Sequence, residues 1–204
     1  MLLSVIYLIA ITAEAMTGAL AAGRRQMDLF GVIIIACVTA LGGGTLRDVV
    51  LDHYPLGWVA HPEYLLLTIG AALLTIVIAP VMHRLHRAFL VLDALGLVAF
   101  TLIGCAIARE GGHSPVIVVV SGMLTGVFGG VLRDVLCNEI PLVFRKELYA
   151  VVSLLTGAGY LTLLALGIGE SVSVLACLAG GFLLRLLAIR YGLEIPKFDY
   201  RDRD

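Results

Sequence analysis

Charged residues are scarce in this chain. Of its 204 residues, Asp, Glu, Lys and Arg make up 14%, hydrophobic residues make up 60%, and the mean hydropathy is +1.04. A soluble domain carries about a quarter charged residues. The scarcity of charge excludes an ordinary soluble globular protein and favours a protein embedded in a membrane.

Signals for several other function classes are also missing from the sequence. The formal net charge is −1, and no block of Lys or Arg is long enough to indicate a nucleic-acid partner. The chain has no GxxxxGK[ST] loop for phosphates, and its four cysteines lack CxxC spacing. It also has no nucleophile–base set. We therefore expect a protein that is not an enzyme, has no metal site or cofactor and binds no nucleic acid.

Seven long apolar runs are present instead. At a rise of 1.5 Å per residue, about 20 helical residues cross a hydrocarbon core of roughly 30 Å, and each run is close to that length. Helices satisfy their own backbone groups in lipid, whereas open strands do not. The sequence predicts an all-α integral membrane protein with seven transmembrane helices, over residues 2–23, 29–50, 64–82, 88–108, 115–137, 148–169 and 171–190.

The basic residues gather on one side of the predicted bundle. That side has ten of them, and the other side has Arg109 alone. Because segments rich in Lys and Arg stay in the cytoplasm, we predict a multi-pass protein of the cell inner (plasma) membrane, with its N-terminus outside and its C-terminus cytoplasmic. The ten basic residues are Arg24, Arg25, Arg84, Arg87, Arg145, Lys146, Arg190, Lys197, Arg201 and Arg203.

An internal repeat organises the chain. Aligning 7–56 with 93–142, an offset of 86 residues, gives 13 identities in 50 positions without a gap. Each copy holds three spans, and an odd number of crossings makes the second copy inverted relative to the first. We therefore predict a 3+3 inverted repeat in residues 1–87 and 88–169, followed by a seventh transmembrane helix in 170–192 and a polar cytoplasmic tail in 193–204.

The strongest matched segment is GGGTLRD at 42–48, which returns as FGGVLRD at 128–134. Small residues let neighbouring helices approach closely, which is one interpretation of the glycines. The other is that adjacent glycines bend or unwind a helix and turn backbone carbonyls towards a polar cavity. Because Arg and Asp are repeated with them, we favour the second interpretation, a functional break in each helix at its glycines.

Each motif ends in a pair of opposite charges, Arg47–Asp48 and Arg133–Asp134. Adjacent residues of an ideal helix point about 100° apart, so we expect each charge to find its partner elsewhere. The arginines could instead extend to the nearer membrane interface, whereas aspartate is too short to do so. Ionisable residues inside a membrane are functional candidates, so we predict that all four line or gate a pathway.

Three further polar residues belong to this prediction. Thr39 and Thr125 lie one helical turn before the paired glycines, where a hydroxyl either lines a polar path or bonds the carbonyl four residues earlier. Glu14 is in the middle of the first span, where we expect it to face a pore or cavity. Asp93 and Arg185 are near the ends of their spans, which favours positions at the membrane interface.

The two motifs, GGGTLRD at 42–48 and GGVLRD at 129–134, within two three-helix repeats and a seventh span, resemble the prokaryotic branch of the trimeric intracellular cation (TRIC) channel family. The resemblance covers about residues 3–192. It implies a homotrimer of seven-helix subunits, each with its own pore for monovalent cations, chiefly K⁺. It also implies that the second and fifth helices are kinked at their glycines and contribute to that pore. The pore hinges implied by the resemblance are Gly42, Gly43, Gly44, Gly129 and Gly130.

A passive K⁺ channel is therefore the predicted function, with K⁺ as a permeant ion rather than a cofactor. Membrane lipids are expected neighbours, but the Lys-Glu-Val motif that animal members use for phosphoinositides is missing here. Related bacterial proteins are also described as transporters of small amino acids, glycine in particular. A secondary transporter of that kind is the alternative, because an inverted repeat with broken helices suits both functions.

Overall fold

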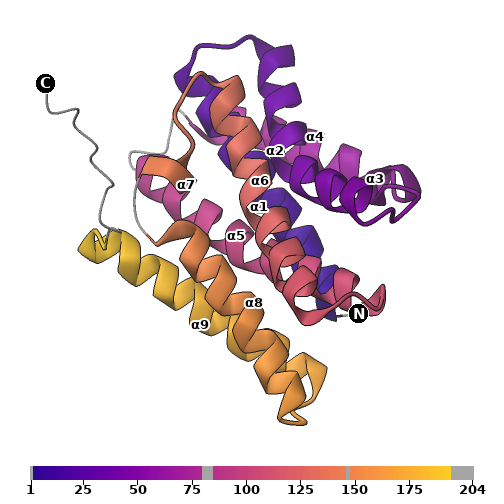
Figure 1. Cartoon of the computed structure of the whole chain (residues 1–204). Coiled ribbons are helices and arrows are strands. Elements are labelled where there is room, and N and C mark those ends of the chain that lie inside the picture. Colours follow the sequence, from indigo (N-terminus) through magenta and orange to yellow (C-terminus); the bar gives the residue numbers. More distant parts are fainter. Residues whose placement is uncertain (1, 80–84, 146–147, 194–204) are drawn as a thin grey trace, which may run out of the picture.

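The computed structural model describes residues 2–79, 85–145 and 148–193. Every regular element within these ranges is a helix (Figure 1). The predicted tail lies outside them from residue 194 onward. The helices are α1 (Leu2–Arg24), α2 (Leu29–Val50), α3 (Gly57–Ala60), α4 (Glu63–Ile78), α5 (Leu85–Glu110), α6 (Pro115–Leu136), α7 (Leu142–Arg145), α8 (Tyr149–Ala165) and α9 (Glu170–Tyr191).

Five of these helices, α1, α2, α5, α6 and α9, are long and apolar enough to cross a membrane. The other two apolar helices, α4 and α8, have 16 and 17 residues. Each of these seven helices coincides with one of the predicted apolar runs. The predicted all-α fold is confirmed, and the crossing of the membrane by α4 and α8 stays a prediction.

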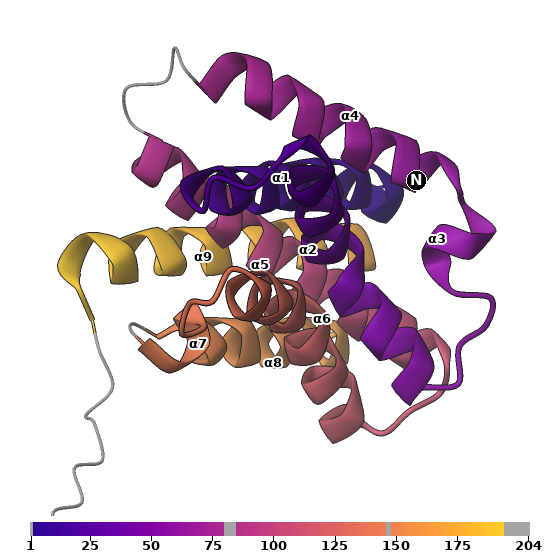
Figure 2. The same ribbon diagram turned by 90° about the horizontal axis from the view of Figure 1, so that it is seen from above.

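The helices pack as two units of three. In the first unit α1, α2 and α4 contact one another, and in the second α5, α6 and α8 do so. The units meet where α1 packs on α5 and α2 packs on α6, while α9 packs on α8 and α5. In Figures 1 and 2, α4 and α8 lie on opposite sides of the molecule. The short helices α3 and α7 follow α2 and α6, so both units have the same order of elements.

The helices α2 and α6 cross in opposite directions, with one glycine from each at the crossing. A Cβ atom on Gly43 would overlap the carbonyl oxygen of Thr125, and a Cβ atom on Gly129 would overlap that of Thr39. Later residues of one helix thus face earlier residues of the other, which makes the two helices antiparallel. The second unit is therefore inverted relative to the first, as the sequence predicts.

Neither helix unwinds at its glycines. α2 is helical without interruption over Leu29–Val50, and α6 over Pro115–Leu136. In Figure 2 the axes of both helices change direction partway along their length. The alternative in which the glycines unwind the helices is therefore wrong, and a hinge role for them stays a prediction. At the crossing, the absence of side chains on Gly43 and Gly129 lets the two helices approach closely.

Candidate functional site

The Arg–Asp pair of each motif is buried in the last turn of its helix. Arg47 donates from Nε and Nη2 to Asp48 Oδ1 at 2.9 and 2.6 Å, and Arg133 Nε donates to Asp134 Oδ1 at 2.8 Å. The prediction that these neighbours find separate partners is therefore wrong. The arginine side chain is long enough to fold back and reach the carboxylate of the next residue within the last turn.

The second oxygen of each aspartate binds the chain that follows. Asp48 Oδ2 accepts a hydrogen bond from the backbone N–H of Gly57 at 3.1 Å, and Asp134 Oδ2 accepts one from Leu142 at 2.9 Å. These N–H groups belong to the first residues of α3 and α7, where a helix leaves its donors unpaired. Each aspartate therefore connects a buried arginine to a short connecting helix, and His53 Nδ1 adds a contact of 3.1 Å to Asp48 Oδ1.

Arg133 also contacts polar side chains of two other helices. Its Nη1 atom donates to Asp93 Oδ1 on α5 at 2.8 Å and to Thr17 Oγ1 on α1 at 3.1 Å. Glu14 Oε2, also on α1, lies 3.8 Å from Nη1 and accepts a hydrogen bond from Thr17 Oγ1 at 2.8 Å. Three carboxylates thus surround one guanidinium, in what we call the Arg133 cluster: Glu14, Thr17, Asp93, Arg133 and Asp134.

Aromatic rings border this cluster. The guanidinium carbon of Arg133 lies 4.6 Å from the centroid of the Phe89 ring, and that of Arg24 lies 4.7 Å from the same centroid. Arg185 packs in the same way on Tyr149, at 4.6 Å. A cation over an aromatic face is attracted by the ring quadrupole, so these rings stabilise guanidinium groups that are partly or wholly removed from water.

The corresponding site of the first repeat is less acidic. In the repeat alignment Tyr7 takes the position of Asp93, and Phe100 takes the position of Glu14. The rings of Tyr7 and Phe100 contact each other edge-on, with 6.1 Å between centroids. The arginine of this site pairs with Asp48, so one guanidinium faces one carboxylate. The two repeats therefore have the same backbone plan but differ in charge.

Three buried polar atoms of these sites have no hydrogen-bond partner among the described residues. They are Asp93 Oδ2, Arg133 Nη2 and Arg47 Nη1. A buried polar or charged group without a partner costs free energy, so such atoms in a native fold call for an explanation. They are the points at which the two sites can bind an ion, water or a polar solute.

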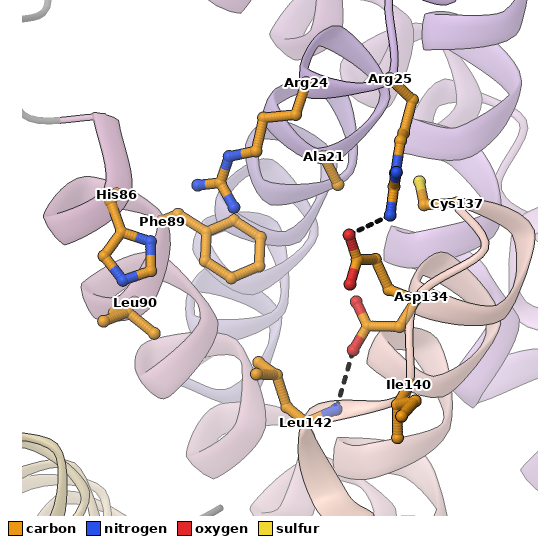
Figure 3. Close-up of a pocket in the computed structure, with 11 residues that line it drawn as sticks. Ala21, Arg24, Arg25, His86, Phe89, Leu90, Asp134, Cys137, Ile140 and Leu142 are labelled. Atoms are coloured by element: carbon orange, nitrogen blue, oxygen red, sulfur yellow. Dashed lines mark hydrogen bonds and ion pairs between the residues drawn. The ribbon is translucent and has the colours of Figure 1, made fainter. Parts of the chain in front are cut away.

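A pocket of about 160 Å³ lies next to the Arg133 cluster. Asp134 and Phe89, which both contact Arg133, form part of its lining. Figure 3 shows Asp134 on one side of the pocket, with Phe89 and Arg24 on the other. The pocket therefore extends from the surface at the end of α1 to the wall of the cluster.

Arg25 connects the two repeats at this pocket. It donates to the backbone carbonyl oxygen of Asn138 at 3.2 Å and forms an ion pair with Glu139. Arg25 follows α1 and Glu139 follows α6, so the pair joins loops of different repeats. The two side chains are 39% and 40% exposed, and the contact is therefore within reach of solvent.

The two threonines that precede the motifs bond to their own helices. Thr39 Oγ1 donates to the Ile35 carbonyl at 2.6 Å, and Thr125 Oγ1 donates to the Ser121 carbonyl at 2.7 Å. This is the second of the two alternatives that the sequence leaves open. Their role in a pathway stays a prediction.

The other three candidate hinge glycines each lie beside a side chain. A Cβ atom on Gly42 would lie 2.6 Å from Leu132 Cδ1, closer than van der Waals contact allows. A Cβ atom on Gly44 would lie 3.7 Å from Arg47 Nη2, and one on Gly130 would lie 3.4 Å from Arg133 Nη2. Of these three positions, only Gly42 is too close to its neighbour for a Cβ atom, whereas Gly44 and Gly130 lie at ordinary contact distance from the guanidinium of their own helix.

Sequence reasoning missed Asp93 as a member of the site. Its position near the start of a span predicts a place at the membrane interface, but it is 0% exposed and pairs with Arg133. The same prediction for Arg185 is wrong, because that residue is 1% exposed and packs on Tyr149. The sequence did contain a signal for Asp93, because it is an acidic residue within a span and the aligned residue of the first repeat, Tyr7, is not acidic.

Several known proteins are similar to this chain in sequence. A family model described as "Glycine transporter" matches residues 4–80 and 90–165. The UPF0126 inner membrane protein YadS of Escherichia coli (strain K12) is 40% identical over 186 residues, which are 90% of each chain. The UPF0126 membrane protein YvgT of Bacillus subtilis (strain 168) is 30% identical over 196 residues, 95% of each chain.

Solved structures with this fold are cation channels. The TRIC trimeric intracellular cation channel orthologue from Rhodobacter sphaeroides has a TM-score of 0.91 and 36% identity, and the match covers 94% of this chain and 99% of that chain. A prokaryotic TRIC channel crystallised in 0.5 M KCl has a TM-score of 0.89 and 33% identity, over 94% of this chain and 97% of that one. The chain therefore has the fold of a TRIC channel.

Proposed function

This chain belongs to the glycine transporter family. We propose that, within this family, it is a membrane channel for monovalent cations, chiefly K⁺. The observation that supports this most is the match to the TRIC channel orthologue, with a TM-score of 0.91 over 94% of this chain. Conduction requires no chemical change of the permeant ion, so we propose no enzymatic role and no cofactor.

The pathway runs within each subunit, along the crossing of α2 and α6. Each motif's Arg–Asp pair is at the C-terminal end of its helix, and the helices are antiparallel, so the two pairs lie on opposite sides of the crossing. Arg47, Asp48, Arg133 and Asp134 make the two halves polar, and small shifts at the glycine crossing open or close the path between them. Selection in such a path comes from hydroxyls, carbonyls and water together with a few charged side chains.

The protein works as a homotrimer in the inner membrane, surrounded by lipid. The trimer is proposed because the similar R. sphaeroides structure is of a trimeric channel, and the location because YadS is an inner membrane protein. The excess of basic residues on one side assigns the C-terminus to the cytoplasm. The pocket beside the Arg133 cluster then opens on the cytoplasmic face.

The experiment that tests this function is a K⁺ current measurement across a planar bilayer that contains the purified protein. We expect discrete current steps carried by K⁺, and we expect Asp48→Asn and Asp134→Asn to lower the conductance. Glu63→Gln is the control, because that carboxylate is 62% exposed and lies at the start of α4. Normal conductance in both aspartate variants, with correct folding, would remove these residues from the pathway.

A second candidate function is secondary transport of glycine, which the name of the matched family suggests. Arg133 Nη2 is a buried donor without a partner and Asp93 Oδ2 a buried acceptor without one, among the described residues. These atoms could bind the carboxylate and the ammonium group of a small zwitterion. Saturable glycine uptake into liposomes, without K⁺ current from the same preparation, would favour this function over the channel.

A further inference from the structure

Three carboxyl groups face one guanidinium at the centre of the Arg133 cluster. The carboxylates of Glu14, Asp93 and Asp134 lie 3.8, 2.8 and 2.8 Å from nitrogen atoms of the one Arg133 guanidinium. Buried charges are costly unless they are paired, and one guanidinium neutralises one carboxylate. Two further guanidiniums, those of Arg24 and Arg185, pack against the bordering rings of Phe89 and Tyr149.

One carboxylate oxygen at this centre has no donor. Asp93 is 0% exposed, its Oδ1 accepts from Arg133, and its Oδ2 accepts no hydrogen bond from the described residues. A carboxylate oxygen in that position is an open ligand for a cation.

Glu14 packs against the backbone of α5. A Cβ atom on Gly96 would lie 2.6 Å from the carboxyl carbon of Glu14, so the carboxyl group packs directly on the α5 backbone one turn beyond Asp93. Thr17 donates to Glu14 Oε2 at 2.8 Å and also accepts from Arg133. Glu14, Thr17 and Asp93 thus supply carboxylate and hydroxyl oxygens from α1 and α5 around the same guanidinium nitrogen.

The first repeat provides an internal comparison. Tyr7 and Phe100 stand where the cluster has Asp93 and Glu14, and they leave that site with one carboxylate, Asp48, on its arginine. The backbone plan is shared, so the two additional carboxyl groups beside Arg133 come from these two positions, Glu14 on α1 and Asp93 on α5. A property that depends on these two groups should therefore be confined to the Arg133 cluster.

We propose that Glu14, Asp93 and Thr17 form a binding site for a dehydrated monovalent cation beside Arg133. Carboxylate rings are a common means of attracting cations, and acidic residues inside membranes mark ion pathways. The ion reaches the site from the pocket whose wall includes Asp134 and Phe89. As the site of the permeant ion, this assignment rests on the proposed channel function. It implies that the half of the pathway at Arg133 binds the cation and the half at Arg47 does not.

The test measures cation binding separately from conduction. The thermal unfolding midpoint of the purified protein in detergent is followed as K⁺ replaces N-methylglucamine at constant ionic strength, because a ligand that binds only the folded state raises this midpoint. We expect wild type to show a K⁺-dependent rise, and Glu14→Gln and Asp93→Asn to lose it. Glu14→Asp, which keeps the charge on a shorter side chain, should need a higher K⁺ concentration for the same rise.

One control variant separates this site from general effects of charge. Glu63→Gln removes an exposed carboxylate at the start of α4 and should keep the K⁺-dependent rise. An equal rise in wild type, Glu14→Gln and Asp93→Asn, or no cation-specific rise in wild type, would overturn the proposal. A K⁺-dependent rise that Glu14→Gln abolishes, in a protein that carries no K⁺ current, would uphold the site and refute the channel function.

Discussion

Replacing Gly43 with alanine tests whether this glycine is a packing position or only a flexible point in α2. If Gly43 is only a flexible point, alanine should stabilise the protein, because alanine is favoured over glycine in helices by about 0.5–1 kcal/mol. If Gly43 is a packing position, alanine should destabilise the protein, because the added Cβ atom would overlap the carbonyl oxygen of Thr125. The two interpretations therefore predict changes in stability of opposite sign.

The contacts at the crossing set the expected size of the effect. The same Cβ atom would lie 3.2 Å from the Thr125 carbonyl carbon and 3.3 Å from the Gly129 nitrogen. All of these neighbours are backbone atoms, so α6 itself must move to restore favourable separations of about 3.5 Å or more. Overpacking of this kind costs about 1–3 kcal/mol. For a chain of this length, each kcal/mol corresponds to a fall of about 2–4 °C in the unfolding midpoint.

The assay is thermal unfolding of the purified variants in one detergent. Gly180→Ala is the matched control, because Gly180 is inside α9 and a Cβ atom there would meet no atom within 4 Å. We expect Gly43→Ala to lower the midpoint and Gly180→Ala to leave it unchanged or raise it. Gly129→Ala should resemble Gly43→Ala, since it faces Thr39 in the same way. A midpoint for Gly43→Ala at or above that of wild type would refute the packing interpretation.

Two further predictions concern the charged pairs. Arg133→Gln should destabilise the protein more than Arg47→Gln, because loss of one partner from a buried pair costs about 3–5 kcal/mol and Arg133 faces three carboxylates where Arg47 faces one. Equal falls in the unfolding midpoint would contradict this. Arg25→Ala should lower stability by less than about 1 kcal/mol, because its pair with Glu139 is well exposed. A larger loss of stability in the same assay would mean that the Arg25–Glu139 pair stabilises the protein more than an exposed ion pair normally does.

The sequence by itself determined the class of the protein and its symmetry. Apolar runs of membrane-spanning length and a motif that recurs after 86 residues are one-dimensional patterns, and both can be read without knowing which helices meet. The same patterns identified Arg47, Asp48, Arg133 and Asp134, because charged residues stand out against an apolar background. They also identified Glu14, although not its partners.

Only the tertiary structure decided how these residues are used. Gly43 and Gly129 could have broken their helices or brought them together, and the choice depended on which faces of α2 and α6 meet. Asp93 looked interfacial because its distance along the span is visible in the sequence, whereas its contact with Arg133 on α6 is not. Pairing between segments separated by 40 residues or more depends on the packing of whole helices, and a linear pattern does not contain that information.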